Sequence, residues 1–244
     1  MTVTLSLAHI DDIPNIVAAE RDSFENPLQP IFRLYCPLYH SREETIAHNA
    51  AEYQDSIRQQ DPNVENVWLK VTDSDLSGNE ILVGGAQWLF VSKETTSIGE
   101  HVQSLTSRYP AGGATVFASQ AFHILRESEA RQKKGRSGEH AYATLGTFFT
   151  IPAYRKRGIG RMLMEWGLKR ADEMDLEAWI EAVPPAVPYY ETFGFVQMET
   201  THLNPECPVA LSAEATAEWN STAESILPIA ATVMCRPARN KGAQ

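Results

Sequence analysis

A basic turn with two glycines, lying between a predicted strand and a predicted helix, constrains this chain most. The turn has the sequence Arg-Lys-Arg-Gly-Ile-Gly and covers Arg155–Gly160. Before it, Ala143–Thr150 is rich in Thr and Phe, which favour strands, and Pro152 then prevents the strand from continuing. After it, apolar residues recur at helical spacing from Ile159 onward. The sequence therefore predicts a strand, a tight turn and a helix in that order.

The N-terminus of such a helix is suited to binding an anion. A helix that begins directly after a glycine turn presents unpaired backbone N–H groups and the positive end of its dipole. This end suits a pyrophosphate, and Gly158 and Gly160 let the backbone approach a ligand because they have no Cβ. We therefore expect an anion-binding segment, called the glycine loop below, made of Arg155, Lys156, Arg157, Gly158, Ile159, Gly160 and Arg161.

Two other kinds of phosphate-binding loop do not fit this segment. A nucleotide-hydrolysing loop needs Gly-Lys followed by Ser or Thr, but Gly160 is followed by Arg161 and Met162. A dinucleotide-binding fingerprint needs a third glycine, and Leu163 stands at that position. From this segment alone, a basic turn without a binding function stays open as an alternative, because glycine is common in turns.

A second motif follows one strand later. Leu176–Ala182 is a short strand of mostly apolar residues, and Tyr190–Phe195 then has the pattern Tyr-x-x-x-Gly-Phe. The pair Arg-x-x-Gly-x-Gly and Tyr-x-x-x-Gly-Phe, in this order and at this separation, resembles the signature regions of the GCN5-related N-acetyltransferases, the GNAT family. The resemblance covers residues 143–200 and is to small-substrate members from fungi and microbes.

The resemblance implies an α/β fold in which helices flank a mixed sheet. The strands Ala143–Thr150 and Glu177–Ala182 enclose a helix and should therefore run parallel. In the GNAT family these two strands splay apart, and the pantetheine arm of acetyl coenzyme A enters the gap. We expect a single GNAT domain over residues 1–244, with an insertion at about 92–140 and an extra strand at about 228–236.

The rest of the chain is consistent with this order of elements. Further strands are expected at Val3–Ala8, Val67–Val71, Ile81–Phe90 and Ile229–Met234, and helices from near Ile13, from near Ser41 and over Thr115–Glu129. Residues 203–227 are interpreted as a surface excursion. The basic run 131–136 is interpreted as a solvated loop, with a counter-charge for coenzyme A phosphates or a lid as the alternative.

The reaction implied by the resemblance is attack of an amine on the thioester of acetyl coenzyme A. It requires a base for the amine, a donor for the tetrahedral oxyanion and an acid for the leaving thiolate. The backbone N–H groups of Phe148, Phe149 and Thr150 are expected to meet the thioester carbonyl and the pantetheine. Tyr190 matches the family tyrosine that protonates the thiolate, with Tyr189 or a purely structural aromatic as alternatives.

The catalytic base is the least defined of these groups. Some family members carry a glutamate on the strand before the loop, but Ala143–Thr150 has no carboxylate. Glu181, at the end of the next strand, is therefore the predicted catalytic carboxylate, followed by Glu139 and His140. A water relay would need none of these residues.

Acceptor recognition in the GNAT family comes largely from the segment between the first two helices. Here this segment is Phe24–Tyr39, which contains Phe32, Tyr35 and Tyr39. These aromatic side chains are interpreted either as core or as a pocket wall. The segment does not identify the acceptor.

The amino-acid composition restricts the kinds of molecule that this protein is expected to bind. With 31 acidic and 21 basic residues, the net charge of −10 argues against nucleic-acid or membrane-surface binding and favours a cationic amine, on a small molecule or a protein. The cysteines Cys36, Cys207 and Cys235 are odd in number and widely spaced, and Met1–Asp12 contains no secretory signal. We expect free thiols in a cytoplasmic protein, with a nuclear location also open, no metal, and a monomer or homodimer.

Two competing functions share these motifs. A catalytically silent module that binds or senses acyl coenzyme A fits the missing strand carboxylate. An acyltransferase that uses another acyl group or an alcohol acceptor fits every motif described above.

Overall fold

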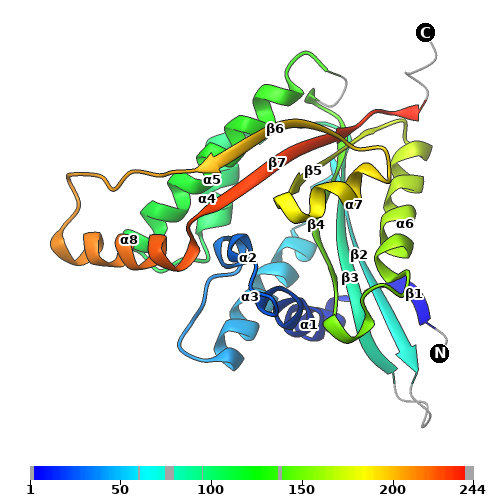
Figure 1. Cartoon of the computed structure of the whole chain (residues 1–244), viewed down its shortest axis with the longest axis horizontal. Helices are drawn as coiled ribbons and strands as arrows, with labels where there is room; N and C mark the ends of the chain where they lie inside the picture. Colours follow the sequence, from blue (N-terminus) through cyan, green and yellow to red (C-terminus); the bar gives the residue numbers. More distant parts are fainter. Residues whose placement is uncertain (1–2, 60, 75–79, 95, 137–138, 240–244) are drawn as a thin grey trace.

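The computed structural model describes residues 3–59, 61–74, 80–94, 96–136 and 139–239, and their strands form one mixed sheet in the order β1-β2-β3-β4-β5-β7-β6 (Figure 1). The strands are β1 (Val3–Leu7), β2 (Val64–Ser74), β3 (Glu80–Val91), β4 (Tyr142–Thr150), β5 (Glu177–Ala182), β6 (Val196–Leu203) and β7 (Ile229–Arg236). The helices are α1 (Ile13–Glu25), α2 (Pro30–Tyr35), α3 (Arg42–Arg58), α4 (Ile98–Thr106), α5 (Gly113–Lys133), α6 (Ile159–Glu173), α7 (Val187–Glu191) and α8 (Ala213–Ile226). The expected α/β fold with a mixed sheet is confirmed.

The two central strands β4 and β5 separate after a short paired stretch. They run parallel, and Tyr142–Thr144 pairs with Glu177–Trp179. Beyond Thr144, β4 continues to pair with β3 but has no partner in β5. This is the splayed arrangement that the resemblance to the GNAT family implies.

Helices cover both faces of the sheet. On one face, Leu163 and Met164 of α6 pack on Trp88 of β3 in a buried core. On the other, Ile16 of α1 packs near Phe149 of β4 in a separate core that α3 completes. Among the described residues, no helix is long and apolar enough to cross a membrane.

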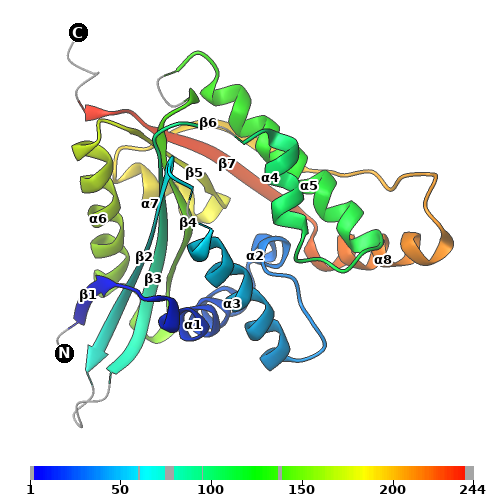
Figure 2. The same ribbon diagram turned by 180° about the vertical axis from the view of Figure 1, so that it is seen from behind.

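A second large core lies around the far end of β6 and β7. Both ribbon views show β7 extending away from the central strands, with α8 at its end and α4 and α5 alongside (Figures 1 and 2). Phe117 and Phe122 of α5 and Trp219 of α8 are buried here. The insertion thus contains α4 as well as the expected helix. The interpretation of residues 203–227 as a surface excursion is wrong for α8, because Trp219 and Ile226 close this core.

The basic run 131–136 is an exposed turn only over residues 134–136. Its first residues form the last turn of α5, and Lys133 is buried with its Nζ 3.1 Å from the ring centre of Tyr142. Arg136 forms an ion pair with Glu177 at 3.7 Å. Tyr142 and Glu177 begin β4 and β5, so these cations lie at the end of the parallel strands opposite the glycine loop. This placement does not support a role with coenzyme A phosphates.

Candidate active site

The glycine loop has the backbone geometry that an anion-binding helix N-terminus requires. Lys156 (φ 62°) and Gly158 (φ 85°) adopt the left-handed conformation. The amide of Met162 donates to the Gly158 carbonyl at 3.0 Å, which makes Gly158 the residue that precedes α6. The N–H groups of Ile159, Gly160 and Arg161 therefore have no partner within the helix.

The two glycines are required for different reasons. A Cβ on Gly158 would meet no atom within 4 Å, so its constraint is the positive φ that L-residues rarely adopt. A Cβ on Gly160 would lie 2.9 Å from the Tyr189 hydroxyl and 3.2 Å from Cζ of Phe148. Gly160 thus lets the first turn of α6 approach β4 and α7 closely.

All three loop arginines make contacts within the protein, and Arg161 pairs with Glu165 of α6 at 3.2 Å. Nη2 of Arg155 donates to the carbonyl of Ser23 at 2.7 Å, and its Nε donates to the carbonyl of Thr150 at 3.3 Å. The guanidinium of Arg157 lies 4.7 Å from the ring centre of Tyr154. Arg155 therefore ties the loop to α1 and to the end of β4.

The two tyrosines of α7 lie on the same face of the sheet as α6. The ring centre of Tyr190 is 6.3 Å from that of Phe148, and that of Tyr189 is 6.0 Å from it. Burial raises the pKa of Tyr190 above its usual value and that of Tyr189 to about 12. Both phenols therefore carry their protons at neutral pH, beside the part of β4 that lacks a β5 partner.

The residues of β4 alternate between the two faces of the sheet. Phe148 points toward α6 and α7, whereas the side chains of Thr147 and Phe149 lie on the opposite face, against α1. Thr150 ends the strand, and its carbonyl accepts a hydrogen bond from Arg155. The unpaired half of β4 therefore has aromatic side chains on the α6 face and side chains that pack against α1 on the other face.

Glu181, the predicted catalytic carboxylate, lies in β5 on the face away from α6. Its Oε2 accepts a hydrogen bond from the Tyr35 hydroxyl at 2.8 Å and forms an ion pair with Nη2 of Arg126 from α5. Its Oε1 is buried and has no hydrogen-bond partner among the residues that the structure describes. Burial raises the pKa of Glu181, and the charge of Arg126 acts in the opposite direction.

Besides Glu181 of β5, Arg126 pairs with a carboxylate of its own helix, Glu129. Its Nη1 lies 2.7 Å from Oε2 of Glu129, and Lys133 lies 2.8 Å from the other oxygen of that carboxylate. Burial alone would raise the pKa of Glu129, but the two cations outweigh burial and hold it at about 2. Glu181 is therefore part of a buried cluster of compensated charges.

Glu20 of α1 is a carboxylate that the motif-based reasoning missed. It is 2% exposed, and the hydroxyl of Thr147 donates to its Oε1. The hydroxyl of Tyr53 in α3 donates to its Oε2 at 3.4 Å. Burial raises the pKa of Glu20 to about 7, against the effect of these two hydrogen bonds.

A sequence signal for Glu20 does exist. Ile13, Ile16 and Val17 form the apolar stripe of α1, and Glu20 continues this stripe at the next helical turn. A glutamate on a buried stripe requires a buried polar partner. The partner Thr147 lies 127 positions away in the sequence, and no local pattern identifies it.

Residues at the end of α2 are linked by hydrogen bonds to both carboxylates, directly to Glu181 and through Tyr53 to Glu20. Tyr35 donates to Glu181, and the next residue, Cys36, has its Sγ 3.3 Å from the hydroxyl of Tyr53, which in turn donates to Glu20. Glu20 and Glu181 thus lie on the same face of the sheet, one beside β4 and the other on β5.

The remaining candidates lie elsewhere. Glu139 precedes β4 and accepts from the amide of Gly135 at 2.9 Å, and His140 follows it, so both are at the start of the strand. Of the aromatic residues in the acceptor segment, Phe32 is core, and Tyr39 stacks on a histidine of α3 with ring centres 4.0 Å apart. Among these aromatics, it is Tyr35 that contacts a candidate site residue.

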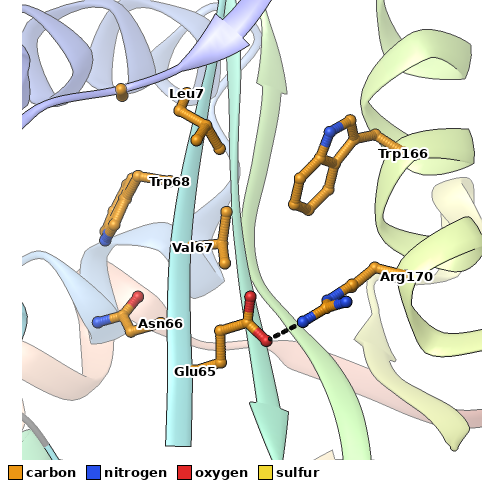
Figure 3. A pocket seen from close by; sticks show the side chains of 8 residues that line it. Leu7, Glu65, Asn66, Val67, Trp68, Trp166 and Arg170 are labelled. Carbon is orange, nitrogen blue, oxygen red and sulfur yellow. Dashed lines mark hydrogen bonds and ion pairs between the residues drawn. The ribbon is translucent and has the colours of Figure 1, made fainter. Parts of the chain in front are cut away.

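Two surface hollows lie away from the unpaired half of β4. One, of about 420 Å³, lies between β2 and α6, where Arg170 pairs with Glu65 at 3.0 Å, and Figure 3 shows the side chains that line it. A second, of about 790 Å³, runs along the outer side of α6 and includes Arg161. Neither is lined by Glu181, Tyr190 or any residue of β4. Among the described residues, no group of three or more His, Cys, Asp or Glu side chains is arranged to hold a metal ion.

Comparison with known proteins gives a family match over part of the chain and a shared fold over nearly all of it. Residues 110–195 match the acetyltransferase (GNAT) family, a range that includes α5, the glycine loop and the Tyr-x-x-x-Gly-Phe motif. No curated protein matches the chain.

Several solved structures share the fold. A Drosophila melanogaster polyamine N-acetyltransferase is 10% identical with a TM-score of 0.61, covering 97% of this chain and 100% of its own. A mosquito arylalkylamine N-acetyltransferase-like protein is 11% identical with a TM-score of 0.60 and the same coverage. A histone acetyltransferase HPA2-related protein from Corynebacterium glutamicum is 19% identical with a TM-score of 0.53, covering 98% of this chain and 97% of its own.

Proposed function

We propose that this protein transfers an acetyl group from acetyl coenzyme A to an amine, because residues 110–195 match the GNAT acetyltransferase family and the chain shares its fold with N-acetyltransferases. One juxtaposition carries this proposal. The N-terminus of α6, with Gly160 against Phe148 and the tyrosines of α7, lies beside the unpaired half of β4. Acetyl coenzyme A supplies the activated acetyl thioester.

Each part of the site has a task in this reaction. The N–H groups of Ile159–Arg161 hold the pyrophosphate. Those backbone N–H groups of Phe148–Thr150 that point away from β3 hold the pantetheine and donate to the thioester carbonyl. Tyr190 donates a proton to the departing sulfur, because its raised pKa keeps the phenol protonated until the thiolate forms.

The proposed acceptor is a cationic amine, on a small molecule or a protein. The net charge of −10 and the buried carboxylate of Glu20, whose contacts among the described residues include no ion pair, favour a positively charged group. The Drosophila structure with the same fold is of an enzyme that forms N-acetylagmatine. We further propose a single-domain cytoplasmic enzyme that acts as a monomer or homodimer, with a carboxylate, Glu181 or Glu20, taking part in amine activation.

Thiol release with a panel of amines tests the function. Agmatine, spermidine, tryptamine and a peptide with a free N-terminus are each mixed with the protein and acetyl coenzyme A, and free coenzyme A and product mass are measured. We expect saturable cofactor binding by calorimetry and acetylated product with at least one amine. Absence of saturable binding at millimolar acetyl coenzyme A would overturn the proposal.

A silent acyl-coenzyme-A-binding module is the second candidate. The observation that favours it is the ion pair of Glu181 with Arg126, which compensates the predicted base. This candidate predicts cofactor binding without thiol release across the panel. Product mass also separates acetyl transfer from transfer of another acyl group or transfer to an alcohol.

A further inference from the structure

Consecutive residues of β4 connect the two faces of the gap at one point. Phe148 lies on the α6 face, against Gly160 and the ring of Tyr190. Its neighbour Thr147 lies on the α1 face, where its hydroxyl donates to Glu20. Both residues are on the part of β4 that has no β5 partner. An acetyl thioester placed beside Phe148 is therefore one residue away from the Thr147–Glu20 pair.

The two carboxylates of the α1 face differ in their counter-charges. Glu181 shares Oε2 with the guanidinium of Arg126. The contacts of Glu20 among the described residues are with hydroxyl groups, and none of them is an ion pair. A carboxylate without a bound cation is the stronger proton acceptor of the two, because it has no positive charge that stabilises its ionised form.

We propose that Glu20 is the final proton acceptor for the attacking amine and that the Thr147 hydroxyl passes the proton to it. This proposal rests on the acetyl-transfer function proposed above. It replaces Glu181 as the base and leaves Glu181 as a residue that positions the acceptor side of the site together with Tyr35.

Among Glu20 and the side chains that face it, Glu20 is the group that titrates near neutral pH. Tyr53 from α3 has its pKa raised well above its usual value, and burial raises the pKa of Cys36, after α2, to about 12. Arg108, after α4, acts on Glu20 at longer range and lowers its pKa slightly against burial. Thr147 of β4 does not titrate. The Glu20 pKa of about 7 suits a base that accepts a proton and releases it in each turnover.

The proposed step balances as follows. The amine, in its neutral form, attacks the thioester carbonyl carbon, and the C–N bond forms as the C–S bond breaks. The nitrogen loses one proton to Oγ1 of Thr147, while the Thr147 hydroxyl proton moves to Glu20. The sulfur takes a proton from Tyr190, and the proton held by Glu20 returns to the tyrosinate through solvent.

The experiment compares Glu20→Gln, Thr147→Val and Glu181→Gln with the unchanged protein in thiol release. The amine used is the best one found in the panel, and kcat/KM is measured from about pH 5.5 to 9. We expect Glu20→Gln to lower kcat by about a hundredfold and to remove the rise of kcat/KM through neutral pH. Thr147→Val should lower kcat about tenfold or more, and Glu181→Gln should keep the rise.

The outcomes separate this inference from the proposed function. If the unchanged protein transfers acetyl groups and Glu20→Gln keeps the pH-dependent rise, Glu20 is not the base. A rise that disappears in Glu181→Gln alone would return that role to Glu181. Acetyl coenzyme A affinity, measured by calorimetry for each variant, should stay within about threefold of that of the unchanged protein. Thr147→Ser keeps the hydroxyl group and should recover the activity that Thr147→Val loses.

Discussion

The two faces of the sheet at the gap between β4 and β5 are built in different ways. On the α6 face, a backbone loop and the rings of Phe148, Tyr189 and Tyr190 come together within two short segments of sequence. On the α1 face, Glu20 and Glu181 are held by hydroxyl groups and a guanidinium from distant helices. The proposed cofactor side thus depends on local backbone geometry, whereas the proposed acceptor side is assembled from tertiary contacts.

The largest expected effect concerns the charges on the α1 face. Arg126→Met removes the cation that pairs with both Glu181 and Glu129. Glu129 keeps Lys133, but Glu181 is left buried without an ion-pair partner among the described residues. The free energy of unfolding should fall by about 3–5 kcal/mol, measured by urea denaturation.

Arg131→Met is the matched control for this change. Arg131 is 55% exposed and pairs with Glu199 at 2.9 Å, so its loss should cost less than about 1 kcal/mol. Equal losses in the two variants would mean that the buried cluster contributes no more than a surface ion pair.

The pH dependence of stability reports on Glu20. Its folded pKa of about 7 lies above the usual value of 4.5, so the folded state holds this proton more tightly than the unfolded state does. The contribution is present below about pH 4.5 and is lost as the pH rises to about 7, with a magnitude on the order of 3 kcal/mol. Glu20→Gln should therefore reduce the fall in melting temperature between these pH values, whereas Glu43→Gln, at an exposed position, should not.

Gly160→Val tests the backbone side of the comparison. The added side chain would meet Tyr189 and Phe148 and would cover the approach to the N-terminus of α6. Acetyl coenzyme A affinity should fall by about a hundredfold in calorimetry. Gly99→Val in α4, where a Cβ meets nothing within 4 Å, should bind normally, and a Gly160→Val protein with native affinity would contradict the loop as the phosphate site.

Tyr190→Phe tests the aromatic side chains of the same face. The ring and its packing on Phe148 and Phe195 are kept, and the acid is removed. We expect kcat and kcat/KM to fall together, by about a hundredfold, with unchanged cofactor affinity. If turnover stays within about twofold, Tyr189→Phe becomes the next variant to measure.

The smallest expected effect is that of Arg155→Ala. Arg155 contacts the carbonyls of Ser23 and Thr150, so its removal loosens the loop without removing the backbone N–H groups. Cofactor affinity should fall less than tenfold, the loss expected for one or two hydrogen bonds. A loss as large as that of Gly160→Val would show that Arg155 binds the phosphates directly.

Several elements could be predicted from the sequence because their determinants are local. The strand, turn and helix around the glycine loop follow from consecutive residues, and the parallel pairing of β4 with β5 follows from the helix that connects them. By contrast, the sequence does not predict that α8 is part of a core. Its buried residue Trp219 packs on Phe117, which lies more than a hundred positions away, so no local pattern relates the two. Lys133 was interpreted as solvated because its partners, Glu129 and Tyr142, are not evident from a run of basic residues.

By itself, the sequence determined the mixed α/β fold, the glycine loop and the aromatic residues that accompany it. Backbone conformation at Gly158 and close approach at Gly160 depend on residue type at those positions, and residue type is visible in a sequence. The tertiary structure alone decided that Glu20 meets Thr147 and that Glu181 meets Arg126. Whether a carboxylate ends up beside a hydroxyl or a guanidinium depends on how helices pack on the sheet, and this packing brings together residues that no local spacing relates.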